Sequence, residues 1–146
     1  MTGRMLEESF LMPIEVTWNG YMKYRESFQW CLKHQPTGWD PTDPPTRASS
    51  DLYSEVALAM EEVIGDFNWE ELRFYTALRS PLDEKHGVDG WFEFRGRVVT
   101  VDITENRAKE FGYKADVILF YEDNDYDTNL HLRGSDQVAN HLIGAA

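Results

Sequence analysis

Asp102 is the residue whose chemistry is most out of place in this chain. Residues 98–103 read VVTVDI, which is typical of a buried β-strand. Side chains alternate along a strand, so Asp102 would point away from the face that holds Val101 and Ile103. A carboxylate buried without a partner costs several kcal/mol. An aspartate at this position therefore indicates a specific partner, such as a metal ion or an arginine.

A second aspartate, Asp89, lies near the start of the preceding apolar run. Residues 95–97, Arg-Gly-Arg, are typical of a tight hairpin, which predicts that Asp89 and Asp102 lie on neighbouring strands. A helix predicted upstream carries Glu55 and Glu62 on one edge of its apolar stripe. Two strand carboxylates and one helix carboxylate would form an oxygen-rich site suited to Mg²⁺ or Mn²⁺.

Each of these acidic residues also has a purely structural interpretation. Asp89 precedes Gly90 and would suit a turn. Glu55 would suit a solvated helix edge. Asp102 could form an ion pair with one of three arginines, namely Arg73, Arg95 or Arg107. Other metal chemistry has less support, because residues 122–134 depart from the calcium-loop pattern and the four histidines lack zinc-ligand spacing.

The elements that would position these residues follow from the apolar patterns. Amphipathic helices are predicted at 20–33 and 50–65, joined by the proline-rich connection 36–50. Strands are predicted at 72–78, 88–94, 98–104 and 115–121, with a polar loop at 79–87 and short helices at 105–111 and 135–143. The order α, α, β, β, β, α, β, α predicts an α/β fold with a mixed sheet of about four strands.

The composition limits the class of protein. The 146 residues, 42% of them hydrophobic, suit a single domain over 1–146. No run approaches the roughly 18 apolar residues of a membrane span, and glutamates stand where a secretory signal would be apolar. The single cysteine, Cys31, is expected as a buried thiol. We therefore expect a cytoplasmic protein without a membrane partner, whose net charge of −12 opposes nucleic-acid binding unless cations reverse it locally.

The element order and the acidic residues together resemble the PD-(D/E)xK nuclease superfamily. The resemblance rests on a helix with a glutamate, a strand, the residues Gly87-Val88-Asp89, a hairpin, and a strand that ends Val101-Asp102-Ile103-Thr104. It implies a restriction-endonuclease-like αβββαβ core over residues 51–122. Residues 1–50 would be an N-terminal extension, and residues 123–146 an acidic turn and a helix.

The resemblance implies roles for particular residues. Asp89 and Asp102 match the two motif acids, and Glu55, or less well Glu62, matches the helix glutamate. In the family these residues bind one or two divalent cations that promote hydrolysis of a phosphodiester. Thr104 stands where the family has a lysine, and a threonine cannot supply that positive charge. Either Lys85 or Lys109 replaces the lysine, or the site is inactive.

The function expected from this resemblance is metal-dependent hydrolysis of DNA, by a protein of phage or mobile-element type and in some cases as a homodimer. The basic residues expected to contact DNA cluster around the same loops: Arg79, Lys85, Arg95, Arg97 and Arg107. Two alternatives stay open. One is an inactive nuclease-fold protein that acts through protein partners. The other is an acidic inhibitor that mimics DNA.

Overall fold

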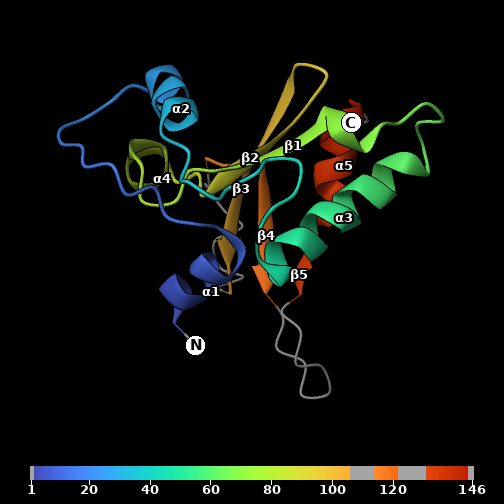
Figure 1. Cartoon of the computed structure of the whole chain (residues 1–146), viewed down its shortest axis with the longest axis horizontal. Helices are drawn as coiled ribbons and strands as arrows, with labels where there is room; N and C mark the ends of the chain where they lie inside the picture. The colour runs from blue at the N-terminus through green and yellow to red at the C-terminus, as the bar shows by residue number, and fades with distance from the viewer. Residues whose placement is uncertain (1, 106–113, 122–130, 145–146) are drawn as a thin grey trace.

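A five-stranded mixed β-sheet forms the centre of the protein (Figure 1). The computed structural model describes residues 2–105, 114–121 and 131–144. The sheet has the order β1-β2-β3-β4-β5, in which β3 and β4 are parallel and the other neighbours antiparallel. The strands are β1 (Leu72–Thr76), β2 (Gly90–Phe94), β3 (Arg97–Thr104), β4 (Val117–Tyr121) and β5 (Leu132–Arg133).

Helices cover both faces of this sheet. They are α1 (Gly3–Phe10), α2 (Tyr24–Lys33), α3 (Arg47–Glu61), α4 (Pro81–His86) and α5 (Ser135–Ile143), with a 3-10 turn at Trp69–Glu71. Figure 1 shows α2 and α4 on one side of the sheet, and α3 and α5 on the other. No helix in the described ranges is long and apolar enough to cross a membrane.

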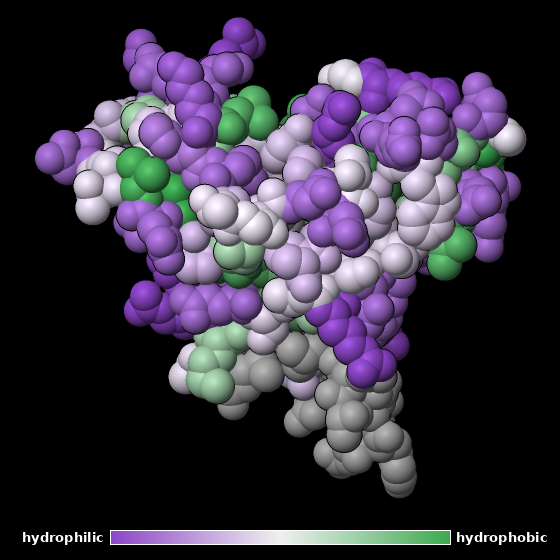
Figure 2. Space-filling view, in the orientation of Figure 1, coloured by the Kyte–Doolittle hydropathy of each residue, from purple (hydrophilic) through white to green (hydrophobic). Residues whose placement is uncertain are grey.

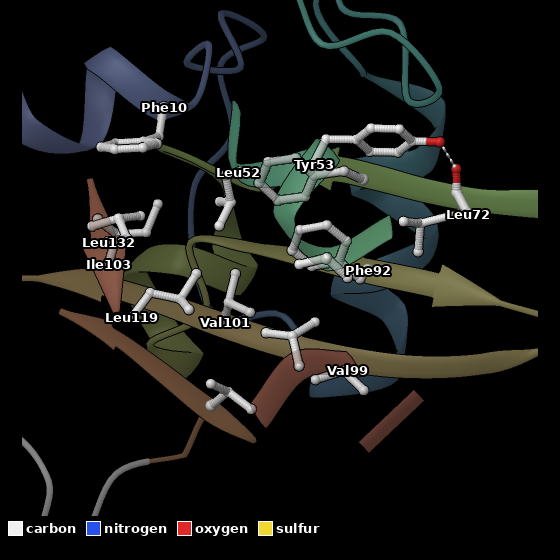
Figure 3. Close-up of a cluster of buried hydrophobic side chains, with 14 of the residues drawn as sticks. Phe10, Leu52, Tyr53, Leu72, Phe92, Val99, Val101, Ile103, Leu119 and Leu132 are labelled. Carbon is white, nitrogen blue, oxygen red and sulfur yellow. Dashed lines mark hydrogen bonds between the residues drawn. The ribbon is translucent and has the colours of Figure 1, made fainter. Parts of the chain in front are cut away.

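Alternation along the strands separates two apolar cores. Phe74, Phe92, Val101 and Ile103 face the larger core, where α1, α3 and α5 pack on the sheet (Figure 3). Their neighbours in sequence face the smaller core under α2 and α4, which includes Tyr75, Trp91, Leu82 and Cys31. Cys31 is buried as expected, and that burial raises the pKa of its thiol to about 11. Asp102 lies between Val101 and Ile103, so its side chain belongs to the α2 and α4 side.

The proline-rich connection covers the edge of the sheet at β1. The Gln35 side chain bonds both backbone groups of Thr76, with Nε2 2.7 Å from the carbonyl oxygen and Oε1 3.2 Å from the nitrogen. Trp39 Nε1 donates to the Phe74 carbonyl at 2.8 Å, and the Phe74 N–H donates to the Pro41 carbonyl at 2.9 Å. These bonds occupy groups that an edge strand would otherwise expose to another chain.

Most of the predicted elements are present, and several are displaced or new. The four predicted strands and the last helix are confirmed, and the hairpin turn has Arg95 and Gly96 at positive φ, as a two-residue turn of matching twist requires. The first predicted helix begins four residues later than expected. The second covers Arg47–Glu61 instead of 50–65, because Thr46 and Ser49 form a capping box at its start. The predicted helix at 105–111 lies largely outside the described residues, and the acidic turn wholly so.

Two α-helices and one strand were not predicted. The polar loop predicted at 79–87 is wrong, because it contains α4, which starts after the Ser80 cap and ends at Gly87 in a left-handed conformation. Helix α1 follows a Thr2 cap, and β5 is only two residues long. With β5 the sheet has five strands, one more than the expected four.

Tyr53 joins α3 to the start of β1, and its removal tests this packing. Its hydroxyl oxygen lies 2.6 Å from the Trp69 carbonyl and 2.7 Å from the Leu72 carbonyl, the bond drawn in Figure 3. Tyr53→Phe should lower the free energy of unfolding by about 0.5–1.5 kcal/mol, measured by urea denaturation. Tyr21→Phe, at a side chain 72% exposed, is the matched control and should leave the midpoint unchanged. Equal midpoints for both variants would contradict this account.

Candidate active site

Asp89 and Asp102 lie in direct contact at the end of β3, on the sheet face covered by α2 and α4. Gly90 pairs with Val101 across the β2–β3 ladder, so Asp89 falls beside Asp102. The Asp89 side chain hydrogen-bonds with that of Asp102, and its Oδ2 also accepts the Ile103 N–H at 2.8 Å. The two aspartates are only 2% and 3% exposed. The predicted adjacency of the two aspartates is therefore confirmed.

The interpretation of Asp89 as a turn residue is wrong. Its N–H donates to the Val101 carbonyl at 2.9 Å, and its carbonyl accepts the Ala77 N–H at 2.8 Å, so the backbone bridges two flanking segments. Gly90 serves the close approach of strands instead of a turn. A Cβ atom at this position would lie 2.7 Å from the Tyr75 carbonyl oxygen, closer than packing permits.

Burial controls the charge of this pair. Removal from water raises the pKa of Asp89 well above its usual value, and the negative charges of Asp83 and Asp102 raise it further. A proton held by Asp89 allows the two carboxyl groups to share a hydrogen bond instead of repelling each other. A divalent cation would favour the ionised form of both, as cations do at carboxylate sites.

Helix α4 brings a third carboxylate to the pair, and Arg79 precedes this helix. Asp83, in the first turn of α4, hydrogen-bonds with Asp89 and accepts the Arg79 backbone N–H at 2.8 Å. Arg79 adopts a positive φ of 68°, and its carbonyl accepts Trp18 Nε1 at 3.0 Å. The strained backbone at Arg79 is thus held by hydrogen bonds on both sides.

Helix α1 completes the cluster from the N-terminal side. Arg79 Nη1 lies 3.2 Å from Glu7 Oε2 and 3.9 Å from Asp83 Oδ2, and its Nη2 lies 3.6 Å from Glu8 Oε1. Burial raises the pKa of Glu7, the charge of Asp83 raises it further, and Arg79 acts in the opposite direction. We call Glu7, Asp83, Asp89 and Asp102 the carboxylate cluster. Arg79 offsets part of the negative charge of this cluster.

The predicted cage of Glu55, Asp89 and Asp102 is not assembled. Glu55 lies on α3, which packs on the opposite face of the sheet from Asp102, and its Oε1 is 2.8 Å from His131 Nε2. Glu62 is exposed at the C-terminal end of α3. The described ranges contain no group of three or more histidine, cysteine, aspartate or glutamate residues arranged to hold a metal ion.

Two carboxylate ligands from the protein are enough for a Mg²⁺ site. Mg²⁺ usually keeps several water ligands and takes one or two carboxylates plus substrate phosphate oxygens. Asp89 and Asp102 supply hard oxygen donors on rigid strands, which fits this donor set. They lack the soft sulfur or imidazole ligands that would favour zinc.

The predicted basic residues divide between two ends of the sheet. Arg79 lies at the carboxylate cluster, and Lys85 is exposed on α4. Arg95 and Arg97 lie at the β2–β3 turn, roughly 17 Å from Asp89 at 3.3 Å per strand residue. Arg95 is already bound to Glu71 at 2.8 Å and to Asp66 at 3.6 Å. Arg107 and Lys109 lie outside the described residues, and Thr104 is buried on β3.

Sequence reasoning missed Glu7 and Asp83. Asp83 had a recognisable signal, because Ser80-Pro81 is a typical start of a helix and places an acidic residue in its first turn. Glu7 had none, since its position depends on how α1 packs near the end of β3. The guanidinium of Arg79 was expected near the site, but as a DNA contact and not as the partner of three carboxylates.

No protein-family model, curated protein or solved structure matches the chain at a significant level. Inference about activity therefore depends on the geometry of the carboxylate cluster. That geometry is specific: two nearly inaccessible aspartates lie side by side, and Asp83 connects them to an arginine that also pairs with Glu7.

The raised pKa of Asp89 predicts a distinct pH dependence of stability. The folded state binds the Asp89 proton more tightly than the unfolded state does, and this tighter binding stabilises the fold. The stabilisation is complete below the pKa of Asp89 in the unfolded chain, and it is lost as pH rises through the pKa of Asp89 in the folded protein. Asp89→Asn keeps an acceptor for the Ile103 N–H but removes the charge. Relative to wild type, the variant should therefore become more stable as pH rises from about 4 to 8.

Urea denaturation in EDTA at several pH values measures this difference. Asp40→Asn is the control, because hydrogen bonds from Thr42 lower the pKa of Asp40 and the sign of its contribution is opposite. A loss of stability in Asp89→Asn that is equal at every pH would contradict the buried, proton-sharing pair.

Proposed function

We propose that the protein is a divalent-metal-dependent nuclease whose metal site is the pair Asp89 and Asp102. The observation that carries the proposal is the contact between these two side chains, which come from neighbouring strands and are 2% and 3% exposed. Burying two carboxyl groups side by side is costly, so a pair placed in this way suits a role that uses both groups.

The topology supports the same proposal. A helix, α3, precedes three successive antiparallel strands, and β4 then adds parallel to β3, which requires a crossover connection between them. This order is compatible with the restriction-endonuclease-like core expected from the sequence. In such a core, Asp89 directly before β2 and Asp102 within β3 would stand at the positions of the two motif acids.

The residues of the site would have different roles. Asp89 and Asp102 would hold the cation, and the bound metal would supply an activated water and stabilise charge on the attacked phosphate. The Ile103 N–H and Asp83 fix the orientation of Asp89. Arg79 offsets the charge of Glu7, Glu8 and Asp83, which lowers the repulsion that a phosphate meets at the site.

A second candidate function is an inactive nuclease-fold protein that acts through a protein partner. Two observations favour it. Thr104 occupies the position of the family lysine, and Glu55 is bound to His131 instead of joining the aspartates. An inactive site would keep the fold and lose only metal-dependent chemistry.

Metal titration distinguishes the two candidates. Wild type should bind Mn²⁺ in calorimetry and cleave plasmid or labelled DNA with Mg²⁺ or Mn²⁺. Asp102→Asn should lose cleavage by at least about 100-fold, more than loss of an outer partner of a metal ligand usually costs. Glu55→Gln is the matched control and should retain binding and cleavage, because Glu55 lies on the other face of the sheet.

The outcomes separate cleanly. Binding and cleavage that survive Asp102→Asn would refute the aspartate pair as the metal site. A wild type that neither binds Mn²⁺ nor cleaves DNA would favour the inactive protein. Thermal unfolding of each variant checks that a loss of activity reflects the site and not the fold.

A further inference from the structure

A chain of aromatic contacts leads from the sheet to the surface beside the carboxylate cluster. Trp91 on β2 contacts Phe28, whose ring lies 5.0 Å from that of Tyr24. Both tyrosines contact His86: the ring centroid of Tyr24 lies 5.4 Å from that of His86, and the centroid of Tyr21 lies 5.7 Å from it. We call Tyr21, Tyr24 and His86 the aromatic platform.

The platform presents aromatic surface to solvent from a fixed base. Tyr21 is 72% exposed and Tyr24 40% exposed, whereas His86 is only 7% exposed. The His86 ring is held by Nε2, which lies 2.8 Å from the Met22 carbonyl oxygen. On the face shown in Figure 2, hydrophilic residues dominate and hydrophobic ones form small separate groups, which does not favour a broad apolar interface there.

Two connections place the platform next to Asp89 and Asp102. Trp91, at the base of the aromatic contacts, pairs across the sheet with Thr100, which precedes Asp102 by two residues and therefore faces the same side of β3. His86 follows Asp83 by three residues on α4, so both lie on one side of that helix. A strand bound at the platform would thus lie on the side of the sheet that carries the aspartates.

Three cations lie next to the platform residues in the sequence, together with the acids Glu26 and Glu84. Lys23 and Arg25 flank Tyr24, Lys85 precedes His86, and all three are exposed. None of these three cations takes part in an ion pair among the described residues, in contrast to Arg79 and Arg95. In a chain of net charge −12, such cations beside exposed rings suit a polyanion with aromatic bases.

We propose that the aromatic platform stacks unpaired bases, so that the substrate is nucleic acid that is single-stranded beside the cleavage point. This inference rests on the proposed nuclease function and narrows its substrate. A tyrosine ring can stack on any base, but a base inside a duplex has no free face for it. The three cations would contact the phosphates of the same strand.

Binding measured without catalysis tests the platform. Fluorescence anisotropy in EDTA at low salt would compare a labelled 12-nucleotide oligo(dT) with its duplex. Wild type should bind the single strand more tightly than the duplex. Tyr21→Ala should weaken single-strand binding by roughly 5- to 100-fold, the usual cost of one lost base stack, whereas Tyr21→Phe should retain it.

A charge variant provides an independent control. Lys85→Ala should weaken binding of the single strand. Lys33→Ala should not, because Lys33 lies at the C-terminal end of α2, roughly 14 Å from Tyr24 at 1.5 Å per residue. Equal affinity for single strand and duplex, no measurable binding, or unchanged binding by Tyr21→Ala would each overturn the platform.

Asp102→Asn separates this inference from the proposed function. The variant should lose cleavage, and in EDTA its binding of the single strand should still be weakened by Tyr21→Ala. Tyrosine-dependent binding without cleavage by wild type would support the platform and refute the nuclease. Cleavage of DNA that is insensitive to Tyr21→Ala would support the nuclease and overturn the platform.

Discussion

The contact between Asp89 and Asp102 is the constraint on which the rest of the structure depends. Two carboxyl groups held together out of water oppose folding by several kcal/mol, a large part of the roughly 5–15 kcal/mol that stabilises a typical domain. The opposing contribution comes from the two cores on either side of the sheet, since the apolar neighbours of Asp102 on β3 are fully packed. The Ile103 N–H and a shared proton remove part of the cost locally. Packing of the two cores thus offsets the free-energy cost of burying the two aspartates.

Two unusual backbone features, at Arg79 and at Gly90, lie next to the aspartate pair. Arg79 takes a left-handed backbone conformation that costs a non-glycine residue about 1–3 kcal/mol. That conformation directs its N–H to Asp83 while its guanidinium reaches Glu7 and Glu8 on α1. One strained residue therefore links α1, α4 and the carboxylate cluster. Gly90 is required for a related reason, because only a residue without Cβ lets β2 start so close to Tyr75. Strain and close approach are concentrated at one end of the sheet, which is where function usually requires them.

The sequence predicted the strands and the aspartate pair because both depend on local patterns. Alternation fixed the side of β3 on which Asp102 lies, and a two-residue hairpin fixed its neighbour. The position of Glu55 could not be predicted in this way. Its helical edge was identified, but the face of the sheet that α3 covers depends on the packing of Leu52 and Val56 against β-strand residues far along the chain. Helix α1 and β5 were missed for the same reason, since short elements gain their stability from tertiary contacts. Asp83 was accessible from its Ser-Pro cap, and was overlooked because a polar segment was taken as loop.

The distribution of ion pairs decides how a polyanion could approach so acidic a protein. At physiological salt, charges more than about 8 Å apart are largely screened, so the net charge of −12 acts mainly as a sum of local fields. At the β2–β3 turn, Glu71 and Asp66 already neutralise Arg95. At the carboxylate cluster, Arg79 is outnumbered by acids. A strand that crosses α2 and α4 would meet Lys23, Arg25 and Lys85 without displacing an ion pair among the described residues. If the proposed substrate is correct, this approach would bring it to the face of the sheet that holds the aspartate pair without competition from those ion pairs.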